Sequence, residues 1–286
     1  MADDLTPILV TGAGGYLGGE ILTILRSKGV HALAVGRSES CDIYCDLCDL
    51  DSVRSLIHLH PCSLIIHCAA AVPKSQTDYF DQIAGEKSLE MVANLLEAGL
   101  RNIVFASTMT VYPEGISLAR EEDAVRVGKS YPDSKLAAEQ LLLEHSKVTS
   151  AILRIPGLFG RPRKNGVLYR SACALARGQI PDIDKSLPQW AAIHVRDAAK
   201  MFVRAAVTFP PSSTILNVGY PGRMAIADAV RQLAGIFGCE FPLPQPQWFE
   251  FELSKLHSSL GPVPGTFYER LIDLADWARN KDKPSI

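Results

Sequence analysis

The chain has 286 residues, of which 47% are hydrophobic, and a formal net charge of −2. This length and apolar content predict a globular protein of one large or two modest domains. The charges are spread along the chain without a basic run, which argues against nucleic-acid and membrane-surface partners. No apolar run approaches a membrane span and the start of the chain lacks the pattern of a secretory signal, so we expect a cytoplasmic protein.

The cysteines raise the question of a metal site. Seven are present, and five of them lie between positions 41 and 68. Cys45 and Cys48 have only half of the spacing that usually marks a zinc site, and no second Cys or His pair repeats it. We therefore expect no metal, and we interpret the thiols as small buried apolar side chains of a reducing compartment.

Short apolar runs alternate with amphipathic stretches as far as residue 155, which is the pattern of βαβ units in a parallel sheet. The expected strands cover 8–11, 31–36, 43–45, 64–67, 103–106 and 151–155. The expected helices cover 16–28, which Gly29 ends, and then 52–60, 88–98 and 133–146. The sequence therefore predicts an α/β fold of the Rossmann type, with a doubly wound parallel sheet of at least six strands.

Prolines divide the chain into shorter pieces beyond residue 156, among them Pro162, Pro181 and Pro188. This texture predicts a smaller, discontinuous C-terminal lobe that binds substrate. A helix over 197–206 and a strand around 216–218 still have the Rossmann pattern. We thus predict a dinucleotide-binding domain over 1–156, joined by parts of 188–220, and a substrate-binding lobe that takes most of 157–286.

A glycine-rich turn separates the first expected strand from the first helix and reads Thr-Gly-Ala-Gly-Gly-Tyr-Leu-Gly from position 11. Gly12 suits the tight turn, Gly15 lets main chain approach a diphosphate, and Gly18 permits close packing of helix on strand. The helix N-terminus adds free N–H groups and a positive dipole. We therefore expect this turn, together with Tyr16 and Leu17, to bind a dinucleotide.

The end of the second strand favours NADP. Enzymes that use NAD usually place an acidic residue there for the ribose hydroxyls, whereas this chain has Gly36, Arg37 and Ser38. A guanidinium can pair with a 2′-phosphate. In the alternative, Arg37 is a solvated side chain and Glu39 supplies the acid, so NAD stays possible.

Small residues follow two further strands. Asp46 and Leu47 come after the third strand, and His67 ends the fourth. The residues after His67 would let a flat cofactor approach the main chain, and they are Ala69, Ala70 and Ala71. They could also simply pack against a helix, and His67 by itself is more typical of a structural residue than of a catalytic one.

Tyr131 and Lys135 open a helix and share one of its faces, because they lie four residues apart. A neighbouring cation and an oxidised nicotinamide would both favour the phenolate of Tyr131, which makes it a better base. Ser107 and Thr108 end a buried strand upstream. A hydroxyl there could bond the same substrate oxygen that Tyr131 protonates or deprotonates.

Together these motifs resemble the extended short-chain dehydrogenases/reductases, the group that includes NAD-dependent nucleotide-sugar epimerases, dehydratases and reductases. Further motifs of the resemblance are Asn94-Leu-Leu-Glu-Ala, Ile193-His-Val-Arg-Asp197 and Leu216-Asn-Val-Gly219. The resemblance implies an NAD(P)-dependent enzyme, and relatives often form a homodimer through two helices of each subunit. It also implies roles for single residues: Thr108 as hydroxyl partner, Tyr131 as acid/base, Lys135 as its modulator and ribose ligand, Asp46 near adenine, and Pro156, Gly157 and Leu158 against the nicotinamide.

Two departures from the family pattern bear on the substrate. Similar dehydratases carry an Asp-Glu pair after the catalytic hydroxyl, where this chain has Met109 and Thr110, so sugar dehydration is disfavoured. Many nucleotide-sugar enzymes have Asn three residues after the arginine of the next strand. Here Gly157 follows Arg154 at that offset, which weakens the assignment of a nucleotide sugar.

Three functions remain open from the sequence. The first is an NAD(P)-dependent epimerase or 4-ketoreductase of a sugar, nucleotide-linked in its leading form. The second is the same chemistry on a smaller carbonyl compound, and the third is a non-catalytic NADP-binding sensor or scaffold. The candidates for substrate contacts are Lys74, Arg161, Tyr169 and Arg270.

Overall fold

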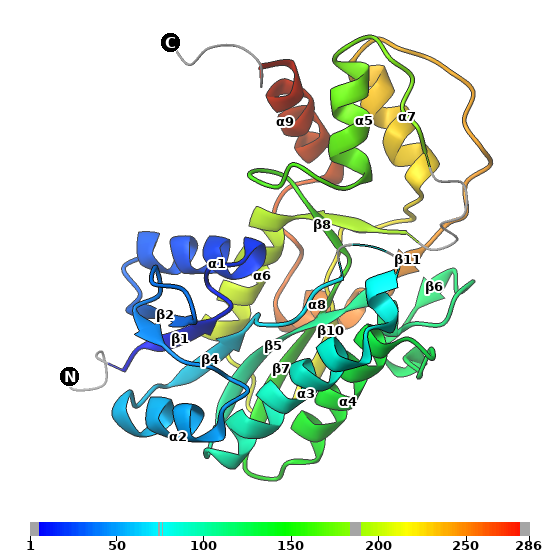
Figure 1. Ribbon diagram of the computed structural model, residues 1–286. Coiled ribbons are helices and arrows are strands. Elements are labelled where there is room, and N and C mark those ends of the chain that lie inside the picture. The colour runs from blue at the N-terminus through cyan, green and yellow to red at the C-terminus, as the bar shows by residue number, and fades with distance from the viewer. Residues whose placement is uncertain (1–5, 74, 76, 184–189, 281–286) are drawn as a thin grey trace.

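The computed structural model describes residues 6–73, 75, 77–183 and 190–280. At its centre lies a seven-stranded sheet in the order β10-β7-β5-β4-β1-β2-β3, with all neighbouring strands parallel (Figure 1). The predicted Rossmann-type α/β fold is thereby confirmed. The strands are β1 (Ile8–Thr11), β2 (Ala32–Gly36), β3 (Ile43–Tyr44), β4 (Leu64–His67), β5 (Asn102–Thr108), β7 (Thr149–Ile155) and β10 (Thr214–Asn217).

Helices cover both faces of the sheet (Figure 1). One face packs against α1 (Tyr16–Ser27) and α6 (Val195–Val207), and their apolar side chains share one core cluster with the strands. The other face packs against α2 (Leu50–Leu59), α3 (Gln82–Glu97) and α4 (Ser130–Glu144), which share a second cluster. Strands that are buried on both faces need nearly continuous apolar sequence, and these apolar runs are the pattern that predicts the strands.

The chain leaves β1 in one direction toward β2 and β3, then returns to place β4 on the other side of β1. At this reversal the connections after β1 and β4 meet. A Cβ on Gly12 would lie 2.7 Å from the main-chain nitrogen of Ala69. Ligands of open parallel sheets bind at such a reversal, outside the carboxyl ends of the strands.

Helices α2, α3, α4 and α6 begin earlier than the sequence predicts, and the largest difference is α3, which starts at Gln82 rather than at Ser88. Asp81 caps it by accepting a hydrogen bond from the Ala84 N–H at 3.1 Å. Gly85 lies in the first turns of α3 and has low helix propensity, so the sequence does not indicate a helix that begins before it. The glycine is needed there because a Cβ would collide with the Ser130 hydroxyl at the N-terminus of α4.

A second lobe lies beyond the carboxyl edge of the sheet (Figure 1). It consists mainly of α5 (Val167–Leu175), α7 (Ile226–Ile236) and α9 (Phe267–Asn280), which share a separate apolar cluster. Two short strand pairs lie between the second lobe and the sheet, β6 (Leu118–Ala119) with β11 (Glu250–Phe251) and β8 (Gly157–Phe159) with β9 (Ala192–His194), while α8 (Ser254–Ser259) packs against β10 of the sheet. Both α6 and β10 return to the sheet from this part of the chain. The domain boundaries given above stay a prediction.

No helix within the described ranges has both the length and the apolar composition needed to cross a membrane. Pro188 and Lys74, which the sequence analysis named, lie outside the described residues.

Candidate active site

The glycine turn after β1 has the geometry that the sequence predicts. Gly12 has a φ of +67°, and its carbonyl accepts a hydrogen bond from the Gly15 N–H at 2.9 Å. A Cβ on Gly18 would collide with this same carbonyl group. Larger side chains at these positions would therefore disrupt both the turn and the approach of α1 to β1.

The outer side of the turn suits a dinucleotide diphosphate. Gly14 and Gly15 are exposed, and nothing lies within 4 Å of where a Cβ on Gly14 would stand. The N-terminus of α1 has no side-chain cap and no acidic residue in its first turn. Its free N–H groups can thus bond an anion without competition from a carboxylate. Leu17 points inward and is buried in the core.

Arg37 lies just beyond β2 and is exposed, which fits both a cofactor phosphate ligand and a solvated side chain. In this structure its Nη1 lies 3.8 Å from Oδ2 of Asp46. The other carboxylate oxygen of Asp46 accepts a hydrogen bond from the Cys48 N–H at 3.1 Å. Leu47 is buried, and its carbonyl accepts a hydrogen bond from Asn94 Nδ2 at 3.0 Å.

His67 at the end of β4 is fully buried beneath the turn. Its Nδ1 pairs with Thr11 Oγ1 at 2.9 Å, its ring stacks on Phe105, and its Nε2 has no partner among the described residues. Burial lowers the pKa of His67 to about 3, and the nearby Lys135 charge acts in the same direction. A neutral, enclosed imidazole fits the structural role expected of it. Beyond it run the accessible residues Ala69, Ala70 and Ala71.

Thr108 and Tyr131 meet at the carboxyl edge of the sheet. Thr108 ends β5, and its hydroxyl accepts a hydrogen bond from the Thr110 N–H at 3.2 Å. Tyr131 stands in the first turn of α4. The Thr108 side chain acts on this phenol and lowers its pKa, against the rise caused by burial. The structure thus brings together the two hydroxyl groups that the sequence analysis assigned to one substrate oxygen.

Tyr79 was not expected at the site. It belongs to a short 3-10 helix, η1 (Thr77–Phe80), and its ring meets the Tyr131 ring edge-on at 5.8 Å between centroids. Its phenol also adds to the electrostatic cost of ionising Tyr131. No sequence motif marks this tyrosine, because the contact depends on how η1 folds over the start of α4.

Lys135 is buried on the inner side of α4. Its ammonium donates a hydrogen bond to the Ala106 carbonyl at 2.8 Å and lies 4.6 Å from the centroid of the Phe105 ring. Burial lowers the pKa of Lys135 to about 8, while Cys68 and Glu139 act in the opposite direction. The ammonium therefore points at the main chain of β5 and not at the Tyr131 phenol.

The pKa of Tyr131 moves against the expectation from sequence. Burial raises the pKa of its phenol above the ordinary range, Tyr79 adds to the rise, and the Thr108 side chain only opposes it. The lowering expected from a neighbouring cation is absent because the Ala106 carbonyl and the Phe105 ring hold the Lys135 ammonium. The protein's own groups thus keep Tyr131 as a neutral phenol, which is a proton donor.

A buried ion pair anchors the helix that carries Tyr131 and Lys135. Glu139, one turn after Lys135, is fully buried and accepts hydrogen bonds from Arg154 of β7, at 3.0 Å from Nε and 2.6 Å from Nη2. Ser107, next to Thr108, donates its hydroxyl proton to the same carboxylate. The Ser107 hydroxyl is therefore bonded inside the protein, so only the main chain of Ser107 is available to contact a cofactor.

The ion pair extends into a network across the sheet. Arg154 Nη1 donates to the Tyr112 hydroxyl at 3.0 Å and to the Glu121 carbonyl at 2.6 Å. Tyr112 in turn donates to Asn217 Oδ1 at 2.5 Å. The Asn217 main-chain N–H in turn donates a hydrogen bond to the Glu121 carboxylate at 2.8 Å, so the network leads back to Glu121. Side chains from α4, β5, β7 and β10 are thereby fixed in one arrangement.

The segment after β7 crosses toward the second lobe beside the glycine turn. Pro156 is buried, Gly157 is exposed, and Leu158 is partly buried in β8. The Tyr16 hydroxyl donates a hydrogen bond to the Gly160 carbonyl at 2.6 Å, which ties this segment to the start of α1. This bond brings Gly160 to the start of α1, and the contact of Pro156, Gly157 and Leu158 with a nicotinamide stays a prediction.

The substrate-contact candidates that the structure describes in the second lobe each contact another side chain of the protein. Arg161 lies 5.3 Å from the Trp277 ring, and Tyr169 packs against the same ring at 5.0 Å. Arg270 donates to both carboxylate oxygens of the buried Asp197, at 2.7 and 2.9 Å. This pairing ties α9 to α6, so the guanidinium of Arg270 is structural.

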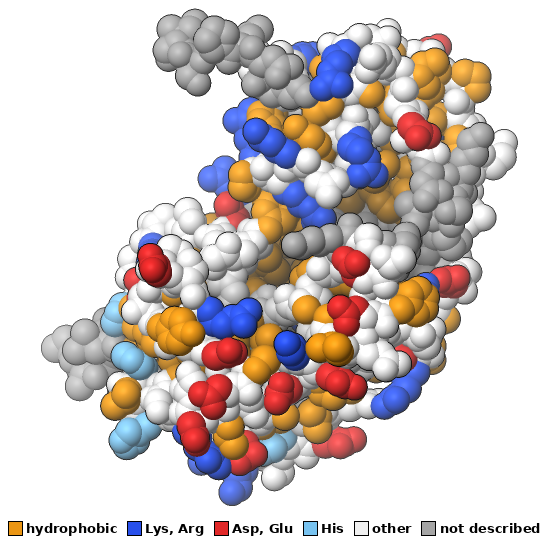
Figure 2. All heavy atoms as spheres, in the orientation of Figure 1, with side chains coloured by type: hydrophobic (Ala, Val, Ile, Leu, Met, Phe, Trp, Pro, Cys, Tyr) orange, Lys and Arg blue, Asp and Glu red, His pale blue; other side chains and the backbone are white. Residues whose placement is uncertain are grey.

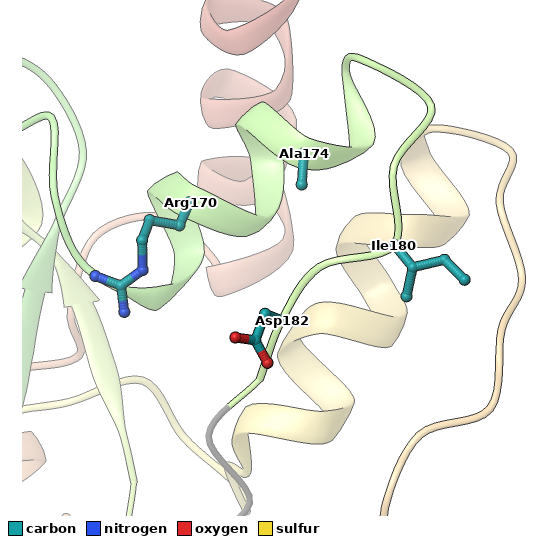
Figure 3. A pocket seen from close by; sticks show the side chains of 4 residues that line it. All are labelled: Arg170, Ala174, Ile180 and Asp182. Atoms are coloured by element: carbon teal, nitrogen blue, oxygen red, sulfur yellow. The ribbon is translucent and has the colours of Figure 1, made fainter.

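A surface pocket lies in the second lobe, between α5 and the segment that follows it. Arg170, Ala174, Ile180 and Asp182 line it (Figure 3). None of the site residues predicted from the sequence is among them. The pocket is therefore separate from the Tyr131 and glycine-turn site.

Within the described ranges, no group of three or more His, Cys, Asp or Glu side chains is arranged to hold a metal ion. Cys45 is buried and its thiol accepts a hydrogen bond from the Ser52 hydroxyl at 3.5 Å. Burial raises the pKa of Cys45 and also that of Cys48. Both thiols are therefore kept in the protonated form, which is a poor metal ligand.

Comparison with known proteins places this site in a family. The family model described as "NAD dependent epimerase/dehydratase family" matches residues 8–219. UDP-glucose 4-epimerase of Azospirillum brasilense is 27% identical over an alignment of 274 positions that covers 82% of this chain and 78% of that protein. Methionine adenosyltransferase 2 subunit beta of Danio rerio is 32% identical over an alignment of 160 positions that covers 55% of this chain and 49% of that protein. The chain thus spans about half the length of this second relative.

The fold has close counterparts among solved structures. UDP-N-acetylglucosamine 4-epimerase from Bacillus cereus superposes with a TM-score of 0.81 at 21% identity, and the match covers 98% of each chain. At this level of identity the likeness shows the fold alone.

Proposed function

The chain belongs to the NAD dependent epimerase/dehydratase family, and on that premise we propose that it moves hydride between NADP and a secondary carbinol of a sugar. The family match confirms the resemblance that the motifs indicated. The observation that carries the proposal is the placement of Thr108, at the end of β5, and Tyr131, in the first turn of α4, at the sheet edge where the glycine turn also lies. The leading form of the substrate is nucleotide-linked, and the reaction is a 4-ketoreduction or an epimerisation.

In this mechanism the chain's own residues bind, orient and exchange a proton. Thr108 and Tyr131 would both bond the substrate oxygen, and Tyr131 donates a proton to it during reduction or removes one during oxidation. Gly12, Gly15 and the N-terminus of α1 would hold the diphosphate of the dinucleotide. Lys135 would bond the ribose. The bound nicotinamide supplies or accepts the hydride at the carbinol carbon.

Two observations favour the reductive direction. Burial raises the pKa of Tyr131, so the phenol carries the proton that a ketone oxygen requires. Arg37 supports NADP, whose reduced form is the usual hydride donor, and it lies exposed beyond β2 with a long 3.8 Å contact to Asp46. A 2′-phosphate would offer Arg37 a stronger, doubly charged partner than this distant carboxylate.

A substrate panel tests the proposal directly. We expect the purified protein to oxidise NADPH with at least one 4-keto nucleotide sugar, or to interconvert a nucleotide sugar with its 4-epimer. Turnover of small ketones alone would instead support the alternative of a smaller carbonyl substrate, which Gly157 at the family's Asn position motivates. No turnover with any member of either class would contradict hydride transfer.

Arg37→Gln is expected to change the choice of cofactor. The variant should bind NADPH about 10- to 100-fold more weakly, because a charge-assisted pair with the 2′-phosphate contributes about 1.5–3 kcal/mol. NADH lacks this phosphate and serves as the matched control, with an affinity that stays within about twofold of the wild-type value. Fluorescence titration measures both affinities. An equal loss for the two cofactors would place Arg37 elsewhere than at the 2′-phosphate.

A second candidate function is that of a cofactor-binding subunit of another enzyme. The observation in its favour is the 32% identity to a methionine adenosyltransferase subunit, a protein named as part of a transferase. The joint presence of Thr108, Tyr131 and Lys135 favours the enzyme instead. Tight NADPH binding without any turnover would support the subunit.

The homodimer implied by the family resemblance is also a proposal. It is supported by α3 and α4, which pack against each other and expose Ile83, Leu141 and Leu143. Two such pairs of helices would bury these apolar side chains in a four-helix interface.

A further inference from the structure

A basic segment borders the cleft between the sheet and the second lobe. Positions 155–181 hold five cationic side chains and no acidic one, namely Arg161, Arg163, Lys164, Arg170 and Arg177. Among the described residues, no ion pair involves any of the five. Figure 2 shows Lys and Arg side chains gathered on the second lobe beside the hollow that separates it from the sheet. Within the described residues this positive charge thus has no ion-pair partner, although Asp182 follows the segment and lines a pocket together with Arg170.

Arg163 is held over the start of α1. Its guanidinium carbon lies 5.9 Å from the centroid of the Tyr16 ring, and its Nη1 makes a long 3.4 Å hydrogen bond to the Leu158 carbonyl. The hydrogen bond from Tyr16 to Gly160 fixes the segment beside the glycine turn. Most of the donors of Arg163 therefore remain available close to the proposed dinucleotide site.

The charge of Arg163 also reaches the opposite side of the cleft. Burial raises the pKa of both Tyr16 and Tyr79, and Arg163 opposes the rise at each phenol. The Tyr79 ring in turn meets the Tyr131 ring at 5.8 Å. Arg163 thus lies beside Tyr16 at the start of α1, and its charge is felt at Tyr79, which contacts Tyr131 at the mouth of the proposed active site.

We propose that Arg163 binds a phosphoryl group at this mouth, an inference that rests on the proposed function. Its planar guanidinium offers paired N–H donors that match phosphate oxygens. Arg161 and Lys164 add positive charge within two positions of it. Such a concentration of cations favours a multiply charged anion over a single carboxylate. The phosphoryl group belongs either to the substrate or to the diphosphate of the dinucleotide.

Two titrations test the proposal and separate these sources. In the first, inorganic pyrophosphate is titrated into protein saturated with NADPH, and in the second, NADPH is titrated into the free protein. Arg163→Gln should weaken one of the two affinities by about tenfold or more. Loss of pyrophosphate binding assigns the group to the substrate, and loss of NADPH binding assigns it to the dinucleotide. The matched control Arg177→Gln, in the same segment, should leave both affinities within about twofold.

The proposal is overturned if Arg163→Gln leaves both affinities at the wild-type value, or if Arg177→Gln lowers them equally. Equal loss would mean that only the general positive field matters. Arg163 is exposed, so its replacement should preserve the fold, which a melting curve verifies. Neither titration requires turnover, so failure here leaves hydride transfer standing, and an inactive substrate panel leaves the phosphoryl site standing.

Discussion

Tyr131→Phe is expected to lower kcat/KM by about 10²–10⁴-fold, the usual contribution of a general acid or base. The substitution removes only the phenolic oxygen, so the substrate oxygen loses its proton donor while the Phe ring keeps its edge-on contact with Tyr79. Steady-state kinetics on the substrate found in the panel measures the loss. NADPH affinity should stay within about twofold, because the glycine turn and the start of α1 are unchanged.

A tyrosine remote from the site provides the control for this experiment. Tyr268 is exposed on α9, and Tyr268→Phe should leave both turnover and cofactor affinity at the wild-type level. If Tyr131→Phe retained full activity, proton transfer would have to come from another group. Tyr79 is the nearest alternative phenol, and Tyr79→Phe would then become the variant to measure.

The parts of the site that could be predicted from sequence depend on main-chain geometry. The glycine spacing and the apolar runs are local patterns, and each predicts a main-chain structure directly. The structure contains both the tight turn after β1 and the expected strands. The start of α3 was missed because Gly85 looks like a helix breaker until Ser130 is seen against it. Helix propensity is a local average, and here a tertiary contact decides the residue.

The direction in which the long Lys135 side chain points could not be predicted from the sequence. The four-residue offset correctly predicts that Tyr131 and Lys135 lie on one helix, but it does not predict that the Lys135 ammonium bonds the Ala106 carbonyl. That bond depends on how β5 lies against α4, and the distance between the two elements along the sequence does not determine this. The pairing of Arg37 with Asp46 is a similar case, since both residues were singled out for the cofactor and their contact with each other was not expected.

One signal in the sequence could have revealed more. Arg154 is a single charge inside the apolar strand Ala-Ile-Leu-Arg-Ile, and a buried charge requires a partner. Glu139 stands eight positions after Tyr131 and four after Lys135, hence on the same helical face. Reading these facts together predicts an ion pair that fixes the catalytic helix to the sheet, which is what the structure contains.

Glu139→Ala is therefore expected to have the largest effect on stability. It should lower the free energy of unfolding by about 3–5 kcal/mol, because it leaves the buried Arg154 guanidinium without its counter-charge and removes the acceptor of Ser107. Chemical denaturation measures the loss. Glu144→Ala supplies the matched control, since Glu144 is exposed at the end of the same helix and should change stability by no more than about 0.5 kcal/mol.

A double variant separates the cost of an unpaired charge from the value of the pair. Replacing Glu139 and Arg154 together by methionine removes both charges and keeps most of the volume, so stability should recover much of what Glu139→Ala loses. Turnover should not recover with it, because the Ser107 hydroxyl, next to Thr108, would lose its acceptor and Tyr112 would lose the bond from Arg154. A double variant with full stability and full activity would show that the network is dispensable for the site. Restored folding with low kcat would instead assign Glu139 and Arg154 to positioning Thr108 and Tyr131.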